Sequence, residues 1–249
     1  MKTPQHNSSF GTNATAADLE HAMLTQANPA DAKILMHFFK TGHGQYGEGD
    51  KFLGCKNPVT RRTAKAFRNL PVQEAICAAH SEWHEIRLCA LLILLSHYES
   101  KKAGEKERAA IFEHYAKLAR CGFVNNWDLV DLTAPGITGT YAFEHGADSL
   151  ERFISSGHLW EERIAVLSMF PFIRANQLDE PFRMVDRFLP HPHDLMHKAC
   201  GWMLREIGKR DRAALTSYLQ MKKTAMARTT LRYAIEHYPE PERKAFLAR

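Results

Sequence analysis

A chain of 249 residues, 45% hydrophobic and 24% charged, has the composition of an ordinary globular protein in one large or two small domains. No apolar run reaches the roughly 18 residues that span a bilayer, and we expect no signal peptide because Met1 to Thr15 lack an apolar core. The five cysteines have no close spacing, which predicts reduced thiols in a cytosolic protein rather than disulfides or a zinc site.

The net charge of +5 is unevenly distributed along the chain. Residues 51–70 and 213–235 contain no acidic residue. The basic residues of these two blocks are Lys51, Lys56, Arg61, Arg62, Lys65 and Arg68, and then Lys222, Lys223, Arg228 and Arg232. Such blocks favour a polyanionic partner, most simply a phosphate backbone, although a surface solvated by counter-ions is the alternative for each block.

Hydrophobic periodicity predicts an all-α protein, with a disordered lead at residues 1–14 and a single helical domain over 15–249. The predicted helices cover 15–26, 31–40, a segment from Pro58, three segments within 75–120, a short segment after Asn126, one or two within 141–153, then 159–174, 181–189, 194–208 and two or three more, the last at 240–247. In no segment do hydrophobic and polar residues alternate as they do in a β-strand. Because helix pairs recur about every 35–45 residues, we predict a HEAT-like α-solenoid of antiparallel helix pairs with a basic concave face.

Two patterns resemble known binding motifs but lack their context. Residues 42–47 match the glycine pattern of a dinucleotide-binding loop, yet a predicted helix precedes them and Glu48 and Asp50 follow, so a mobile connector or a lid over a ligand groove fits better. His80 and His84 are four residues apart, but Glu82 is one place late for a protease zinc helix. These two histidines are therefore interpreted as structural or surface residues, and we predict no metal.

The segment 125–131 combines a helix start with an aromatic residue and two acids. Asn126 is a good N-cap, and Trp127 and Asp131 are four apart, so a helix places them on one face. We expect Pro135 to close the segment. An indole beside a carboxylate suits a cationic or sugar-like ligand, whereas the alternative is a core tryptophan and a solvated acid. Asp128 is rotated about 100° from Trp127 and is the poorer candidate.

At this point four stretches in order resemble the AlkD-type DNA alkylation repair family of HEAT-like glycosylases. They are FLGCKNP at 52–58 with Arg61, NWDLVD at 126–131, LWEERIA at 159–165 and HKACGWMLRE at 197–206. The similarity runs from about Asp31 to Leu247, and it implies excision of alkylated purines from DNA without a cofactor. We expect a monomer that acts on duplex DNA and not at a membrane.

The resemblance also assigns residues. Trp127 and Trp202 match the two aromatics that flank the lesion, Asp131 matches the catalytic carboxylate, and Arg163 matches a basic residue of the active site that can hold a phosphate. The positions that match DNA-backbone contacts are Lys56, Asn57, Arg61, Lys198 and Arg205. On the predicted helix at 194–208, Lys198, Trp202 and Arg205 share one face.

The residues suit this chemistry. A purine alkylated at N3 or N7 is positively charged and leaves without a strong general acid, so one carboxylate can stabilise the sugar cation and position a water. Two rival interpretations are a non-catalytic HEAT-repeat DNA-binding protein, which would tolerate loss of Asp131, and a protein–protein scaffold, which would need no basic face.

Overall fold

The computed structural model describes residues 13–248, and they gather into two compact units that divide between Thr133 and Ala134. The described residues contain helices and turns but no strand. The all-α prediction is therefore confirmed, while a single domain over 15–249 stays a prediction. Of the predicted disordered lead at residues 1–14, residues 1–12 lie outside the described residues. None of the described helices is both long and apolar enough to cross a membrane.

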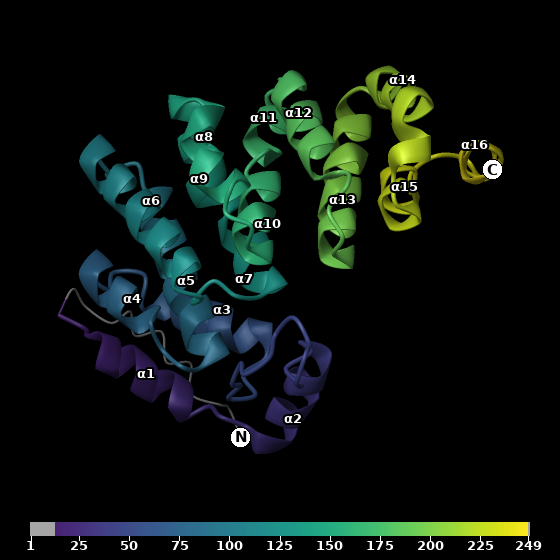
Figure 1. The fold of residues 1–249 in the computed structure, drawn as a ribbon. Coiled ribbons are helices and arrows are strands. Elements are labelled where there is room, and N and C mark those ends of the chain that lie inside the picture. The colour runs from purple at the N-terminus through teal and green to yellow at the C-terminus, as the bar shows by residue number, and fades with distance from the viewer. Residues whose placement is uncertain (1–12, 249) are drawn as a thin grey trace, which may run out of the picture. The chain divides into compact units, whose positions relative to one another are not determined.

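The first unit is built around one buried helix (Figure 1). Its helices are α1 (Ala16–Leu24), α2 (Pro29–Phe38), α3 (Asn57–Ala66), α4 (Val72–Ala78), α5 (His84–Tyr98), α6 (Glu105–Arg120) and α7 (Trp127–Thr133). Helices α1, α3, α4, α6 and α7 all pack against α5. That helix is apolar almost all round, which is the pattern of a helix buried on several sides, and Ile86, Leu91 and Leu94 are fully or almost fully buried.

The second unit is organised around α13 (Asp194–Arg210). Its other elements are the π-helix η1 (Pro135–Gly139), α8 (Thr140–His145), the 3₁₀-helix η2 (Ala147–Leu150), α9 (Glu151–Ile154), α10 (Leu159–Leu167), α11 (Phe170–Arg174), α12 (Asp179–Phe188), α14 (Arg212–Lys222), the 3₁₀-helix η3 (Lys223–Ala225), α15 (Arg228–Ala234) and α16 (Glu240–Leu247). Helices α10, α11, α12, α14 and α15 pack on α13. Within the unit, each helix contacts helices that lie within a few elements of it in the chain, as expected for an α-solenoid.

Gly201 explains the close approach of α13 and α15. A Cβ atom at this position would lie 2.6 Å from the carbonyl oxygen of Thr230 and 2.5 Å from the Cβ atom of Tyr233. Only a residue without a side chain leaves room for the backbone of α15 here.

Two predicted boundaries are wrong. The predicted helix at 159–174 is interrupted at Ser168 and Met169, because Pro171 has no N–H and its ring obstructs the preceding turn, so α10 and α11 are separate. Pro135 does not end the helical backbone either. It is the first residue of η1, a position at which proline costs no hydrogen bond, and α8 follows directly.

Candidate functional site

Helix α7 presents Trp127 and Asp131 as the sequence predicts. The side-chain oxygen of Asn126 accepts a hydrogen bond from the Trp127 N–H at 2.9 Å, and the helix begins there. Leu129 and Val130 are fully buried, whereas Trp127 and Asp131 are only partly buried. The indole and the carboxylate therefore share the less buried side of the helix.

Trp127 is held by the aromatic residues at the end of α2. Its indole stacks on the Phe39 ring with centroids 5.2 Å apart, and it meets the Phe38 ring edge-on at 5.9 Å. Phe39 is buried and stacks in turn on Phe52 at 5.0 Å. Trp127 is thus neither an isolated surface residue nor a fully buried core residue. It is the outer member of an aromatic stack.

Asp131 lies close to Tyr115 of α6. The Tyr115 hydroxyl is hydrogen-bonded to the Thr133 hydroxyl at 2.9 Å. Burial and the negative charge of Asp131 raise the pKa of Tyr115, against the opposing effect of the Thr133 hydrogen bond. The phenol therefore stays neutral at physiological pH and does not compete with Asp131 as an anion.

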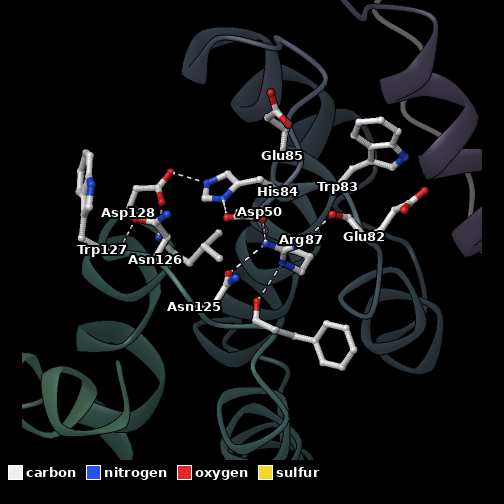
Figure 2. A network of polar contacts seen from close by, with 12 residues as sticks. Asp50, Glu82, Trp83, His84, Glu85, Arg87, Asn125, Asn126, Trp127 and Asp128 are labelled. Carbon is white, nitrogen blue, oxygen red and sulfur yellow. Dashed lines mark hydrogen bonds and ion pairs between the residues drawn. The ribbon is translucent and has the colours of Figure 1, made fainter. Parts of the chain in front are cut away.

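A buried histidine connects α7 to the preceding loop. His84, the first residue of α5, places its Nδ1 atom 2.8 Å from Asp50 and its Nε2 atom 3.0 Å from Asp128 (Figure 2). All three side chains are at most 3% exposed. The imidazole also stacks on Phe52 at 4.4 Å. One ring thus bridges two carboxylates, one from the loop and one from the first turn of α7.

Arg87 completes this network. Its Nη2 atom donates to Asp50 at 2.6 Å and to the Asn125 side-chain oxygen at 3.0 Å, and its Nε atom donates to the Phe123 carbonyl at 3.0 Å (Figure 2). Arg87 therefore fixes the segment that leads into α7. Figure 2 shows Arg87 and His84 meeting at Asp50 from the same helix turn.

The charges of the network balance only when His84 is protonated. A neutral imidazole has one N–H and donates from one nitrogen only, whereas an imidazolium donates from both nitrogens. Burial alone would lower the pKa of His84, but the carboxylates of Asp128 and Asp50 outweigh burial and raise it to about 9. Although burial opposes the shift, His84 and Arg87 hold the pKa of Asp50 below its usual value.

Glu85 anchors the chain that leads into the basic helix α3. Its buried carboxylate accepts hydrogen bonds from the backbone N–H groups of Leu53, Gly54 and Cys55 at 2.8–3.0 Å. Residues 50–55 are therefore anchored by Glu85 and, through Asp50, by His84, whereas a mobile connector or a lid at residues 42–47 stays a prediction. Gly54 has φ +88°, a conformation that glycine adopts without strain.

Helix α3 carries a stripe of exposed cations. Arg61, Arg62 and Lys65 lie on the helix, Arg68 follows in the turn just after its end, and all four are exposed. Among the residues that the structure describes, none of the four forms an ion pair. Lys56, at the start of the helix, pairs with Asp31 at 3.0 Å, and Asn57 is exposed.

The predicted residues of α13 lie on one partly exposed face. Trp202 donates from its indole nitrogen to Glu206 at 3.1 Å and meets the Phe170 ring edge-on at 5.0 Å. Lys198 pairs with Asp194 at 2.8 Å, and Arg205 pairs with Glu236. The opposite face is buried through Ala199, Met203 and Ile207.

Arg163 differs from its predicted environment. Its side chain is 4% exposed, and its Nη1 atom donates to the Leu195 carbonyl at 2.6 Å. Little of the guanidinium is available to a phosphate. The observed contact holds the first turn of α13, the helix that carries Trp202, and this favours a supporting role over direct phosphate binding.

Sequence reasoning missed the partners of α5. The sequence indicates only a structural or surface role for His84, and it makes Asp128 the poorer candidate for the catalytic carboxylate. A signal was present, because α5 is apolar almost all round. A charged residue in the first turns of such a helix must find a buried partner, and His84, Glu85 and Arg87 all do.

A comparison with protein-family models assigns the sequence to one family, and a solved structure shares its fold. The sequence model of a family described as "DNA alkylation repair enzyme" matches residues 19–238. A solved structure described as "Predicted DNA alkylation repair enzyme from Enterococcus faecalis" is similar in fold, with a TM-score of 0.65 and 17% sequence identity over 86% of this chain and 97% of that one. No curated protein matches the sequence at a significant level.

Proposed function

Because the chain belongs to the family of DNA alkylation repair enzymes, we propose that it is a DNA glycosylase. Its substrates are purines alkylated at N3 or N7, such as 3-methyladenine and 7-methylguanine, in duplex DNA, and it hydrolyses the bond between deoxyribose and base. The observation that carries the proposal is helix α7, where Trp127 and Asp131 share a partly exposed face.

Asp131 is the proposed catalytic residue. The alkylated base leaves with its positive charge neutralised, so the deoxyribose becomes electron-poor and needs a nearby negative charge. The Asp131 carboxylate would stabilise this cation and orient the water that attacks it. A single carboxylate suffices because the leaving group needs no proton from the enzyme.

Trp127 and Trp202 are the proposed walls around the lesion. Indole faces attract a cationic base by about 0.5–2 kcal/mol each. Trp127 is supported by Phe39, and Trp202 by Phe170 and Glu206. The convergence of these two tryptophans with Asp131 on one basic concave face stays a prediction, and it is part of the proposal.

Backbone contacts would come from both units. In the first unit, the exposed cations of α3 and the anchored residues Lys56 and Asn57 suit phosphates, because a duplex carries closely spaced negative charges. In the second unit, Lys198 and Arg205 would exchange their carboxylate partners for phosphates. Arg163 would support Trp202 through the Leu195 carbonyl. We propose that the enzyme acts as a monomer in the cytosol, on chromosomal DNA.

The test is incubation of the purified protein with duplex DNA methylated at purines, followed by chromatography of the released bases. Release of 7-methylguanine or 3-methyladenine by the wild type, and its loss in Asp131→Asn, is the expected result. DNA binding without release would favour the non-catalytic DNA-binding protein. Absence of both would favour the protein–protein scaffold.

A further inference from the structure

The first turn of α5 reaches two segments that are distant in sequence. His84 contacts Asp50 of the loop and Asp128 of α7, and its backbone N–H donates to the Lys51 carbonyl at 2.8 Å. Asp128 directly follows Trp127 in the chain. The bridge that His84 forms between Asp50 and Asp128 therefore ends one residue from Trp127, a proposed wall of the lesion site.

The bridge is directional as well as strong. Both ring nitrogens donate to carboxylates along the plane of the imidazole, while Phe52 covers one face at 4.4 Å and Phe39 lies 5.0 Å away. Asp128 is therefore held at a fixed place, and with it the first turn of α7. Phe39 contacts both His84 and Trp127, so the same packing restrains the indole.

We propose that His84 is a positioning residue of the site, which orients Trp127 and Asp131 by holding the first turn of α7 through Asp128. The proposal rests on the proposed glycosylase function. His84 itself touches neither DNA nor the lesion, because its side chain is 1% exposed. The groups that face it are Asp50 of the loop, Asp128 of α7 and the rings of Phe39 and Phe52, with Arg87 beyond Asp50.

The variant that tests this role is His84→Gln, which keeps one donor but loses the second donor and the positive charge. The matched control is His97→Gln at the other end of α5. His97 also donates from a ring nitrogen, to the Leu70 carbonyl at 2.8 Å, and its other ring nitrogen lies 3.8 Å from Glu107 of α6, so neither of these partners belongs to α7. Both variants replace a hydrogen-bonded histidine of the same helix by glutamine, which keeps one donor.

Three measurements separate positioning from general stability. They are the single-turnover rate of base release at saturating DNA, the affinity for undamaged duplex, and acrylamide quenching of Trp127, obtained by subtracting the signal of the matching Trp127→Phe protein. His84→Gln is expected to slow release by about 10–100-fold, as a misplaced reacting group does. Affinity should stay within about twofold, because no phosphate contact is lost. Quenching of Trp127 should increase.

His97→Gln should leave the rate and the quenching unchanged even where it lowers the melting temperature. Equal rates for folded His84→Gln and His97→Gln, or a slow His84→Gln with unchanged Trp127 quenching, would overturn the proposal. If the wild type released no base, the glycosylase function would fail, and the quenching alone would decide whether His84 orients Trp127.

A second variant covers the case in which His84→Gln does not fold. Asp128→Asn retains the shape of the carboxylate and an oxygen that accepts from His84, but it removes the charge. It should show the same pattern of slow release, retained affinity and increased quenching. If Asp128→Asn also failed to fold, the bridge would serve folding rather than the site, and the proposal would be overturned.

Discussion

The Nε2 atom of His84 lies 3.0 Å from a carboxylate oxygen of Asp128, a residue 44 positions later in the chain. Both side chains are at most 3% exposed. The sequence indicates only a weak role for Asp128, as an acid at a helix start. Its actual partner is a buried cation, and this changes what its substitution should do.

Asp128→Asn should destabilise the first unit by on the order of 2–4 kcal/mol, because loss of one partner from a buried ion pair leaves the other charge uncompensated. Urea denaturation of the wild type and the variant measures the change. Glu20→Gln is the control, since Glu20 is exposed on α1 and its loss should change the free energy of unfolding by less than about 0.5 kcal/mol. Equal stability of Asp128→Asn and wild type would show that the bridge contributes nothing.

The stability of the first unit should also depend on pH through His84. Its pKa is about 9 in the folded chain, above the ordinary value of 6.5, because of Asp128 and Asp50. The stabilisation is therefore fully present below pH 6.5 and is lost as the pH rises through 9, by on the order of 3 kcal/mol in total. Melting temperatures between pH 6 and 10 test this. The melting temperature of His84→Gln should fall much less with rising pH than that of the wild type. If the two melting temperatures fell in parallel, His84 would be excluded as the cause of the pH dependence.

The helices could be predicted because their signals are local. Thr15 and Asp18 form a capping box at the start of the helix predicted for 15–26, with the Thr15 N–H donating to Asp18 at 2.8 Å. The apolar run of α5 predicted its burial. By contrast, the break between α10 and α11 depends on a single proline, Pro171, whose effect an apolar periodicity does not register.

The site was predictable only where it lies on one helix. Spacing alone places Trp127 with Asp131, and Lys198 with Trp202 and Arg205. The bridge from Asp50 through His84 to Asp128 depends instead on how a loop and two helices pack, and no local pattern encodes such pairing. Arg163 illustrates the same point, since its spacing on α10 gives no indication of its contact with the Leu195 carbonyl.

Binding of undamaged duplex should fall steeply with salt, because phosphate contacts release counterions. Arg61→Ala should weaken binding to all sequences equally. It should also reduce the slope of log affinity against log salt concentration by about one. Lys101→Ala is the control, since Lys101 is exposed but lies outside α3 and the two basic blocks. Fluorescence anisotropy at several salt concentrations measures both. Equal slopes for Arg61→Ala and Lys101→Ala would remove α3 from the interface.

Asp131→Asn should lower the single-turnover rate of base release by about 10²–10³, equivalent to about 3–4 kcal/mol, because it removes the charge that faces the developing cation. Affinity for DNA should be unchanged or higher, since the lost charge repels phosphates. Release of 7-methylguanine and thermal melting are measured together. A folded Asp131→Asn protein with near wild-type activity would show that another group is the catalytic carboxylate.

The proposed placement of Trp127 and Trp202 at one lesion predicts a kinetic coupling between these two residues, which belong to different units. Trp127→Ala and Trp202→Ala should each slow release, and the double variant should be slower than either by less than the product of the two effects. Residues that act on a shared partner are coupled, whereas residues without a shared partner give independent free-energy changes within about 0.5 kcal/mol. Single-turnover rates of the four proteins complete the cycle.

Trp160→Ala provides the control for this cycle, because Trp160 lies on α10 beside Arg163 but has no assigned role at the lesion. Combined with Trp127→Ala, it should give independent effects. If the effects of Trp127→Ala and Trp202→Ala on the rate were also independent, the two indoles would not contact the same nucleotide. The site would then be confined to α7 and its supports in the first unit, and Trp202 would belong to a separate contact with the DNA.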